Sequence, residues 1–415
     1  MYTKIESFIL NNWQNTVKPA RGGSDTHLAI PYPYSVPCVD DTFTEMFYWD
    51  TYFTNVGLIL SDMTAQAKNN VDNMVHFLNT YGMIPNASVK RSLTRSQPPF
   101  FALMAREVFD ATGDTAWLEN RIYPALVKEY GFWQTKRLAP NGLNFYSSNV
   151  TDEGLLTEYG DTFAKRFGVQ PSDDRETTLE RGRSILALFE CGWDCSSRFG
   201  YEAHHINPVC LCSLLYMMER NGAYFADVLG KTEEAAQWRS RAEARREKMN
   251  ALLWNEDRGV FCDRNYVSGK QADIVSAATF YPLFANLATE AQAEKIARAL
   301  PLLETEYGIA ASEERADLLH LQWDYPHGWA CLHYIAVRGL LNYGMTEDAL
   351  RIADKYVRTV ARCFAETGNL WEKYNMVTGK VSSTTEAQSH TPTMMGWSAG
   401  VFLYCLNLLK ENGKV

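Results

Sequence analysis

The sequence predicts an all-α protein, and in particular an (α/α)6 barrel, from three observations. Apolar residues recur at helical spacing through most of the 415 residues, whereas no long run alternates with the period of two that is typical of strands. No glycine-rich loop of the nucleotide-binding type follows a strand. Three helix starts, Thr232-Glu, Thr289-Glu and Thr346-Glu, follow one another at 57-residue intervals. That interval fits two helices and two connections, and a closed ring of six such pairs is the simplest way to bury them.

In the first half of the chain the apolar spacing predicts helices joined by ordered loops. We expect helices at residues 2–17 and 63–79, after Pro98-Pro99 and across 118–133, with an ordered Gly/Pro-rich loop at 22–37. Gly82 ends the second helix, and Pro85 prevents its continuation. Residues 140–180 are polar, poor in helical periodicity and interrupted by Pro171, so we expect no regular helix there. Helices resume around residues 196–221.

The second half carries the three repeated helix starts. Each has a threonine in the capping position and acidic residues in the first turn, which favours a helix N-terminus. Although 415 residues could form two or three domains, barrels of this length also occur as one. We therefore expect one catalytic domain over residues 1–415, with an N-terminal helix and loops in residues 1–40.

Composition excludes several classes of protein. The net charge of -9 and the lack of basic runs argue against a nucleic-acid partner. No segment approaches the roughly 20 apolar residues of a membrane span, which argues against a membrane protein. The N-terminus lacks the features of a signal peptide, and nine cysteines show no disulfide or zinc spacing. We therefore expect reduced, mostly buried thiols in a cytoplasmic protein, and the sequence leaves its oligomeric state open.

Five segments combine tryptophan with carboxylate or amide groups, in stretches that the pattern places between helices. They are Tyr48-Trp-Asp50, Gly192-Trp-Asp194, Gln322–Trp329, Leu370–Tyr374 and Thr385–Gln388 with Gly396-Trp397. Aromatic rings can stack on the C–H faces of a sugar, while carboxylates and amides bind its hydroxyl groups. Together they predict a small carbohydrate substrate and, because hydrolysis of a glycosidic bond needs two carboxyl groups, a glycoside hydrolase.

Asp194 is the first candidate for the catalytic acid. Gly192 permits a close backbone approach, and Trp193 offers an apolar face that would raise the pKa of a neighbouring carboxyl group. A carboxylic acid that donates a proton near neutral pH needs such an environment. The alternative, an Asp that caps a helix beginning at Ser196, is the more frequent interpretation of an isolated Asp-x-Ser-Ser. The other four segments favour the catalytic interpretation.

Six motifs resemble the successive signatures of the trehalase family of glycoside hydrolases (family 37). They are Phe43-x-Glu-x-x-Tyr-Trp-Asp-Thr-Tyr52, Ile84-Pro-Asn86, Arg95-Ser-Gln-Pro-Pro99, Gly192-Trp-Asp-x-Ser-Ser-Arg198, Gln322-Trp-Asp-Tyr-Pro-x-Gly-Trp329 and Glu372-Lys-Tyr374. They occur in the family's order and span roughly residues 40–400. The resemblance implies an (α/α)6 barrel, no metal or other cofactor, and inversion at the anomeric carbon.

The resemblance also implies roles for individual residues. Asp194 would be the general acid and Glu386 the general base, although the loop of Glu386 lacks the family's glycines and has three additional residues. Glu372 is the rival base. The expected substrate-binding residues are Phe43, Trp49, Asp50, Asn86, Arg95, Gln97, Gly192, Trp193, Trp323, Asp324, Trp329, Glu372 and Trp397.

Two departures from the family pattern concern the leaving-group side of the pocket. The family has an arginine before the Phe-x-Glu motif where this chain has Thr42, and a second arginine whose only counterpart here is Arg175. The short chain also resembles the compact hydrolases of glucosylglycerate and mannosylglycerate. We therefore expect a trehalase-like α-glycosidase, with hydrolysis of such a glycerate glycoside as the alternative. Arg175 or His327 could then bind the glycerate carboxylate.

Several alternatives stay open at this point. Arg198 could form a structural ion pair or contact a ligand, and Glu45 and Asp324 could be structural anchors or sugar contacts. A sugar isomerase or epimerase would use histidines, of which only His327 and His390 fall in the relevant loops. A sugar-binding protein without activity is disfavoured because both candidate carboxylates are present.

Overall fold

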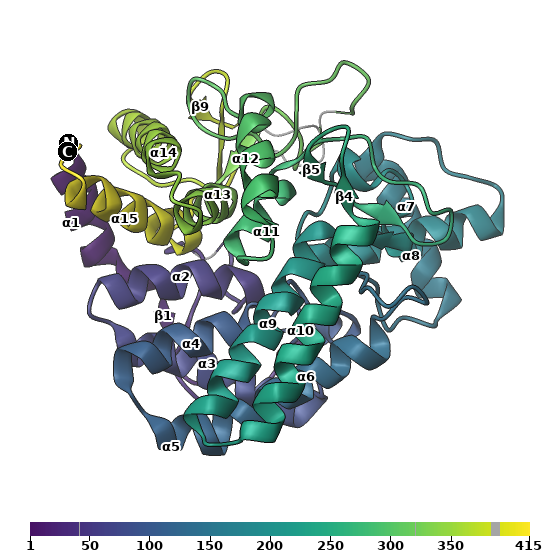
Figure 1. Cartoon of the computed structure of the whole chain (residues 1–415), viewed down its shortest axis with the longest axis horizontal. Helices are drawn as coiled ribbons and strands as arrows, with labels where there is room; N and C mark the ends of the chain where they lie inside the picture. The colour runs from purple at the N-terminus through teal and green to yellow at the C-terminus, as the bar shows by residue number, and fades with distance from the viewer. Residues whose placement is uncertain (41, 320, 383–390) are drawn as a thin grey trace.

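The computed structural model describes residues 1–40, 42–319, 321–382 and 391–415, and it is predominantly helical, as the sequence predicted. Six helices contact one another in a closed cycle within this part of the chain (Figure 1). Around the cycle they are α2 (Tyr48–Leu60), α4 (Phe101–Thr112), α9 (Val209–Val228), α11 (Tyr281–Phe284), α13 (Ala330–Asn342) and α15 (Gly396–Glu411). Most residues of these helices are buried, because neighbours enclose them on several sides.

A second set of helices surrounds this inner ring. It comprises α1 (Tyr2–Asn12), α3 (Thr64–Tyr81), α6 (Tyr123–Lys136), α10 (Thr232–Leu252), α12 (Glu290–Arg298) and α14 (Thr346–Thr367). α3 contacts α2 and α4, α10 contacts α9, and α14 contacts α13 and α15. Alternation of inner and outer helices along the chain makes the fold an (α/α)6 barrel, which confirms the predicted fold class.

The ring closes where the last inner helix, α15, packs on the first, α2. A Cβ atom on Gly400 would lie 2.0 Å from the Phe53 carbonyl oxygen, and one on Gly57 would lie 2.6 Å from the Gly400 Cα. Real Cβ atoms do not approach other atoms so closely, so glycine at both positions lets the two backbones touch. The two chain ends also meet (Figure 1), where Lys410 on α15 pairs with Glu6 on α1.

The three repeated threonines do mark helix starts. α10 begins at Thr232 and α14 at Thr346, while Thr289 is the N-cap of α12. Only Thr289 caps its helix with its side chain: its hydroxyl accepts from the Gln292 backbone, and the Gln292 side chain accepts in return from the Thr289 backbone. The repeat therefore reflects helix spacing more than a shared capping motif.

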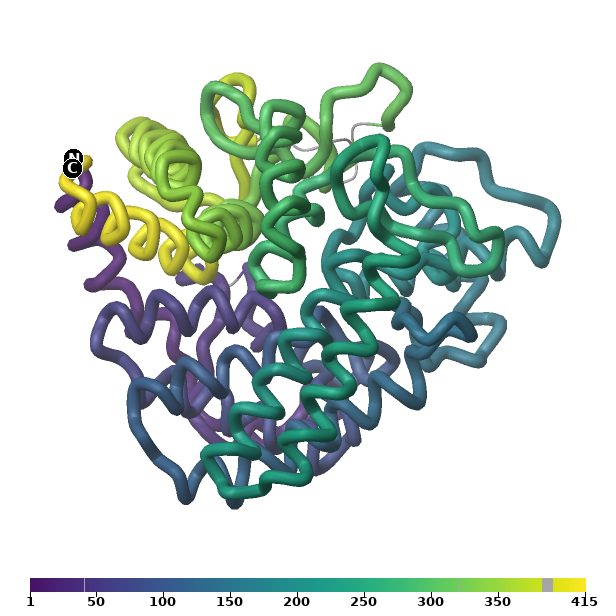
Figure 2. Tube along the Cα trace, viewed as in Figure 1, coloured from purple at the N-terminus to yellow at the C-terminus, as the bar shows by residue number. Residues whose placement is uncertain are grey.

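The expectation that residues 140–180 contain no regular helix is wrong. α7 (Glu153–Phe167) and α8 (Arg175–Cys191) form a hairpin at the edge of the barrel (Figure 2). Asp152 and Asp174 cap the two helices with their side chains, and Gly160 and Gly182 let the helix backbones come into contact. Leu156, Tyr159, Phe163 and Phe167 follow helical spacing on α7, but the charged and polar residues between them make the stretch polar overall.

The helix expected around residues 196–221 begins later, as α9 at Val209. Before it come the single turns η4 (Ser197–Phe199) and η5 (Ala203–His205) and the short strand β3 (Ile206–Asn207), which pairs with β6 (Arg264–Asn265). Other short elements are α5 (Thr115–Trp117), the turns η1 (Trp13–Thr16), η2 (Lys90–Thr94), η3 (Leu118–Ile122), η6 (Ala277–Phe280) and η7 (Leu300–Leu302), and the strand pairs β1 (Val17–Lys18) with β2 (Tyr34–Ser35) and β4 (Trp254–Asn255) with β5 (Val260–Phe261).

One small sheet brings distant motifs together. β7 (His327–Trp329) pairs antiparallel with β8 (Lys373–Asn375), which pairs with β9 (Lys380–Val381). The register sets Trp329 opposite Lys373, so the Glu372-Lys-Tyr374 motif lies against the segment that leads into α13. Within the described ranges no helix is both long and apolar enough to cross a membrane.

Candidate active site

A cavity of about 570 Å³ opens at the end of the ring where α2, α13 and α15 begin. Its volume suits a small ligand. Loops and helix ends from all six motifs converge on it, together with Trp397, although they are far apart in the sequence. Of the predicted site residues it is lined by Phe43, Trp49, Asp50, Asn86, Arg95, Gln97, Gly192, Asp194, Trp323, Trp329, Glu372 and Trp397.

Tryptophans form one wall of the cavity. The rings of Trp323 and Trp329 stack with centroids 3.8 Å apart and planes at 2°. Trp397 meets Trp329 edge-on at 5.7 Å and Trp49 at 5.8 Å. Because each ring is fixed by the others, the wall is a rigid apolar surface of the kind that a sugar face can contact.

The structure corrects the placement of two predicted substrate contacts, Trp193 and Asp324, which do not line the cavity. Trp193 is fully buried behind Trp323, with ring centroids 5.2 Å apart, and the Arg198 guanidinium lies over its other side. Asp194 faces the cavity, whereas Trp193, the residue before it, lies behind the cavity wall.

Asp324 is a structural anchor. Its carboxylate accepts hydrogen bonds from the backbone N–H groups of Ser197, at 2.9 Å, and Leu321, at 2.9 Å, and from the hydroxyl of Ser196 at 3.1 Å. It therefore ties the segment that follows Asp194 to the segment that carries Trp323. Arg198 is also structural, because it forms a buried ion pair with Asp263.

Gly192 sets the position of Asp194. It ends α8 in the left-handed conformation, with φ of 76°, and its N–H donates to the Leu188 carbonyl oxygen at 3.1 Å. A Cβ on Gly192 would lie 2.9 Å from the Trp49 ring. Glycine is therefore required at position 192 for two reasons, namely the backbone conformation and the close approach of Trp49.

Asp194 has the electrostatics of a general acid. The Asp194 side chain is 39% exposed, and the burial of the rest of it raises its pKa to about 6. Arg166 and Arg95 oppose the rise, and Glu372 adds to it. Oδ2 of Asp194 lies 4.0 Å from Nη1 of Arg166. A carboxyl group with this pKa can hold and release a proton near neutral pH.

Asp50 is a second carboxyl group with a raised pKa. It lies in the first turn of α2, and burial raises its pKa to about 8, with Glu372 and Asp194 adding to the rise. At neutral pH the group is therefore protonated and can donate a hydrogen bond to a sugar hydroxyl.

Glu372 lies in the cavity, and Lys373 Nζ is 2.7 Å from its Oε2. The indole N–H of Trp397 donates to the Glu372 carbonyl oxygen at 3.1 Å. Glu386, the predicted base, and His390 lie outside the described residues.

Hydrogen bonds behind the cavity fix several of its lining groups. The Asn86 side-chain amide donates to the Phe189 carbonyl oxygen at 2.9 Å, and the Gln97 side-chain oxygen accepts from the Trp49 backbone N–H at 3.2 Å. The buried carboxylate of Glu190 also accepts a hydrogen bond from the Ser96 backbone N–H at 2.8 Å, and it forms an ion pair with Arg137. The Arg95-Ser-Gln-Pro motif is thereby held against α8.

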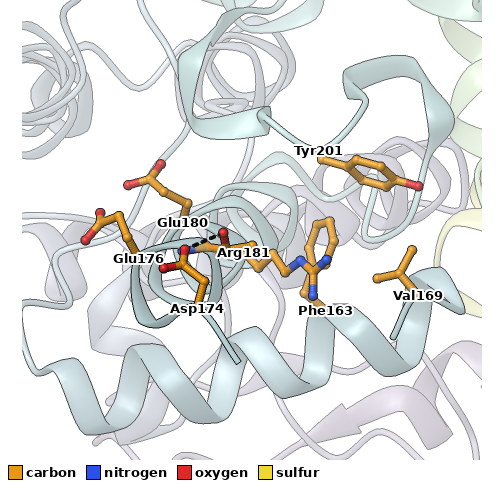
Figure 3. A pocket seen from close by; sticks show the side chains of 8 residues that line it. Phe163, Val169, Asp174, Glu176, Glu180, Arg181 and Tyr201 are labelled. Atoms are coloured by element: carbon orange, nitrogen blue, oxygen red, sulfur yellow. Dashed lines mark hydrogen bonds between the residues drawn. The ribbon is translucent and has the colours of Figure 1, made fainter. Parts of the chain in front are cut away.

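Arg175 and His327, the expected leaving-group cations, both lie outside the cavity. Arg175 is exposed and pairs with Glu153. The residues on either side of it, Asp174 and Glu176, line a different hollow, between α7, α8 and Tyr201 (Figure 3). His327 is buried against Ser382. Thr42 does line the cavity, as does Glu45.

The sequence interpretation missed a group of lining residues on the α7–α8 hairpin and in η2. They are Arg91, Tyr159, Thr162, Arg166 and Phe189. Asp152 before the helix and Gly168 after it are cap signals that could have revealed α7, and with it the side of the helix that carries Arg166. No histidine lines the described part of the cavity.

Comparison with known proteins agrees with this geometry. The trehalase family profile matches residues 9–410. The chain is 31% identical over 406 residues to a periplasmic trehalase of Escherichia coli O8 (strain IAI1), covering 93% of this chain and 70% of that protein. It is 32% identical, with the same coverage, to a periplasmic trehalase of Shigella flexneri.

Among solved structures, the neutral trehalase Nth1 of Saccharomyces cerevisiae superposes with a TM-score of 0.78 at 28% identity, over 97% of this chain and 79% of that one. A GH63 mannosylglycerate hydrolase from Thermus thermophilus superposes with a TM-score of 0.66 at 16% identity, over 96% and 99%, which shows a shared fold. Fold, cavity and relatives together define a glycoside hydrolase with an (α/α)6 barrel. The chain belongs to the trehalase family.

These relatives correct one expectation. We expected a cytoplasmic protein, but the curated relatives named here are periplasmic trehalases. The expected state of the thiols is confirmed, since all nine are free and buried, but buried thiols report on packing in the core and not on the redox state of a compartment.

Proposed function

We propose that this protein is an inverting α-glycosidase that hydrolyses a small α-glucoside, with α,α-trehalose as the first candidate substrate. The observation that carries the proposal is Asp194, a carboxyl group with a pKa of about 6 in a cavity walled by tryptophan. Its place in the Gly192-Trp-Asp motif of a trehalase-family chain supports the same role. The catalytic unit is the whole chain, residues 1–415, acting as one domain.

In this mechanism Asp194 protonates the glycosidic oxygen while a second carboxylate deprotonates a water molecule on the opposite face of the sugar. The protonated Asp50, together with Asn86, Gln97 and Arg95, binds the hydroxyl groups of the sugar. Inversion requires the two catalytic carboxyl groups to be roughly 6.5–9.5 Å apart, so that the water fits between them. The two carboxyl groups suffice for this chemistry, so we expect full activity after treatment with a chelator.

Glu386 is the proposed base, by its place in the family pattern, and Glu372 is the rival. Azide can replace the activated water when the base is removed. Glu386→Ala should therefore abolish hydrolysis and, with azide, form the β-glycosyl azide from an α-glucoside. Glu372→Gln should weaken substrate binding and produce no azide adduct. The reverse pattern would assign the base to Glu372.

The second candidate is an α-glycoside with an acidic leaving group, such as glucosylglycerate or mannosylglycerate. Thr42 lines the cavity where the family pattern has an arginine, whereas Arg91 and Arg166 reach the same cavity from η2 and α7. These two cations could bind the carboxylate of such a leaving group. Rates on trehalose, kojibiose, glucosylglycerate and mannosylglycerate decide between the candidates, since the true substrate should exceed the others in kcat/KM by at least about tenfold.

A further inference from the structure

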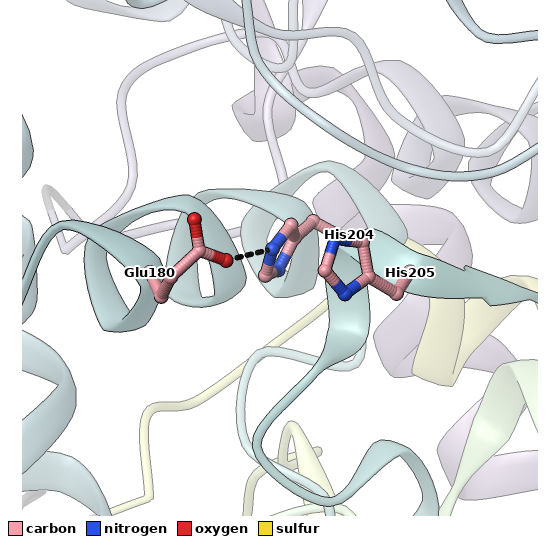
Figure 4. A group of neighbouring side chains, drawn as sticks. All are labelled: Glu180, His204 and His205. Carbon is pink, nitrogen blue, oxygen red and sulfur yellow. Dashed lines mark hydrogen bonds and ion pairs between the residues drawn. The ribbon is translucent and has the colours of Figure 1, made fainter. Parts of the chain in front are cut away.

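Three side chains with nitrogen or oxygen ligand atoms converge on the outside of the barrel (Figure 4). Glu180 comes from the middle of α8, and His204 and His205 come from the single turn η5. One ligand atom from each residue lies within 4.8 Å of the other two. Nε2 of His204 is 2.6 Å from Oε2 of Glu180, and the imidazole centroids are 4.0 Å apart. None of the three residues lines the Asp194 cavity.

Backbone hydrogen bonds hold the two histidines against α8. The N–H of Ala203 donates to the hydroxyl of Ser184, one turn beyond Glu180, at 3.0 Å. On the other side Tyr266 donates its N–H to the His205 carbonyl oxygen at 2.9 Å and its hydroxyl to the His204 carbonyl oxygen at 3.1 Å. The three ligands are therefore brought together by the fold before any ion binds, which lowers the entropic cost of binding.

The cluster also contains a buried ligand nitrogen that the fold leaves without a partner among the described residues. Nδ1 of His204 is buried and has no hydrogen-bond partner within the described chain.

We propose that Glu180, His204 and His205 form a binding site for a divalent transition-metal ion, of which zinc fits best. Two imidazoles and a carboxylate are zinc ligands, whereas magnesium and calcium prefer oxygen atoms alone. Tetrahedral zinc with bonds of about 2.1 Å separates its ligand atoms by about 3.4 Å. The His204–Glu180 pair must therefore open by less than about 1 Å, and water completes the coordination because the Glu180 side chain is 40% exposed.

The position of the site links it to the segment that carries Asp194. Glu180 precedes Asp194 in the chain, and His204 and His205 follow it, so an ion bound by all three closes a loop over residues 181–203. Such a cross-link limits the freedom of the segment that carries Asp194. Arg183 pairs with Glu180, so it must move away when the ion binds and therefore competes with the ion for this carboxylate.

The test is a zinc titration of tag-free full-length protein that has been stripped with a chelator. Calorimetry should show one zinc ion per chain, bound with a Kd in the micromolar range, and cobalt should produce the strong visible absorption of a tetrahedral site. Zinc at a hundredfold excess over Kd should raise the thermal midpoint by about 3 °C. His205→Ala and Glu180→Gln should each weaken binding at least tenfold and remove the thermal shift.

His76→Ala is the matched control, because His76 lies on α3, outside this cluster, and should leave zinc binding unchanged. His205 is partly exposed and Gln is nearly isosteric with Glu, so both test variants should fold, and circular dichroism verifies this. No zinc binding at 1 mM would overturn the proposal, as would binding that persists unchanged in both His205→Ala and Glu180→Gln.

Discussion

Arg166 Nη1 lies 4.0 Å from Asp194 Oδ2, across the gap between the α7–α8 hairpin and the loop that follows α8. Burial raises the pKa of Asp194, and the cation of Arg166 limits the rise. The resulting pKa, about 6, keeps the group protonated in mildly acidic solution. The acidity of the proposed catalytic acid thus depends on a hairpin that lies outside the two rings of the barrel.

The first prediction concerns Asp194 itself. Asp194→Asn should lower kcat on trehalose or another unactivated substrate by about 10³-fold or more, with KM nearly unchanged, because proton donation is lost while contacts remain. The decrease in kcat on α-glucosyl fluoride should be far smaller, since fluoride leaves without being protonated. The exposed Asp161→Asn on α7 is the control. Equal losses on both substrates would remove Asp194 from the role of acid.

The second prediction concerns pH. Activity requires protonated Asp194, so kcat/KM should fall as the pH rises through about 6. Arg166→Met removes the cation that stabilises the ionised form of Asp194, so the pKa of Asp194 rises. The alkaline limb of the plot of kcat/KM against pH should therefore shift to higher pH. Arg166→Lys should shift it less. An alkaline limb that stays in place or moves to lower pH in Arg166→Met would contradict the electrostatic coupling.

The third prediction tests the double requirement for Gly192. Gly113 also ends a helix in the left-handed conformation, but a Cβ there would have no atom within 4 Å. Gly113→Ala should therefore cost about 1 kcal/mol of unfolding free energy. Gly192→Ala should cost more, and it should reduce kcat/KM at least tenfold because Trp49 must move. Urea unfolding and kinetics measure both effects, and equal costs with full activity would refute the Trp49 contact.

The fourth prediction tests whether Asp324 stabilises the fold or contacts the sugar. Asp324→Ala leaves the N–H groups of Ser197 and Leu321 without their acceptor, so it should lower the unfolding free energy by about 2–3 kcal/mol. The exposed Asp317→Ala should cost little. A higher KM with unchanged stability in Asp324→Ala would instead identify a residue that contacts the substrate.

The sequence motifs predicted the fold and twelve of the residues that line the cavity, because both depend on local patterns. Helical periodicity shows which segments are helices, and the tryptophan–carboxylate segments are short enough to recognise by type and order. They could not show which residues face inward on irregular loops. For that reason the motifs predict Trp193 and Asp324 as ligand contacts, although both lie behind the cavity wall.

Residues brought in by tertiary contact left no comparable pattern. Arg166 reaches the cavity only because α7 packs on α8 through Gly160 and Gly182, in a stretch whose polarity obscures its helices. Glu180, His204 and His205 likewise show no metal-binding spacing, since two of them are adjacent and the third lies 24 residues earlier. The cysteines and the N-terminal sequence predict a cytoplasmic protein, which the relatives correct, because free, buried thiols report on packing in the core and not on a compartment.

The most direct measurement is the anomeric form of the products, followed by proton NMR during the first minutes of trehalose hydrolysis, before mutarotation. Inversion converts the attacked glucose to the β-anomer and releases the other as the α-anomer, so the proposed mechanism predicts equal initial amounts of the two. Release of α-glucose alone would show retention and contradict that mechanism.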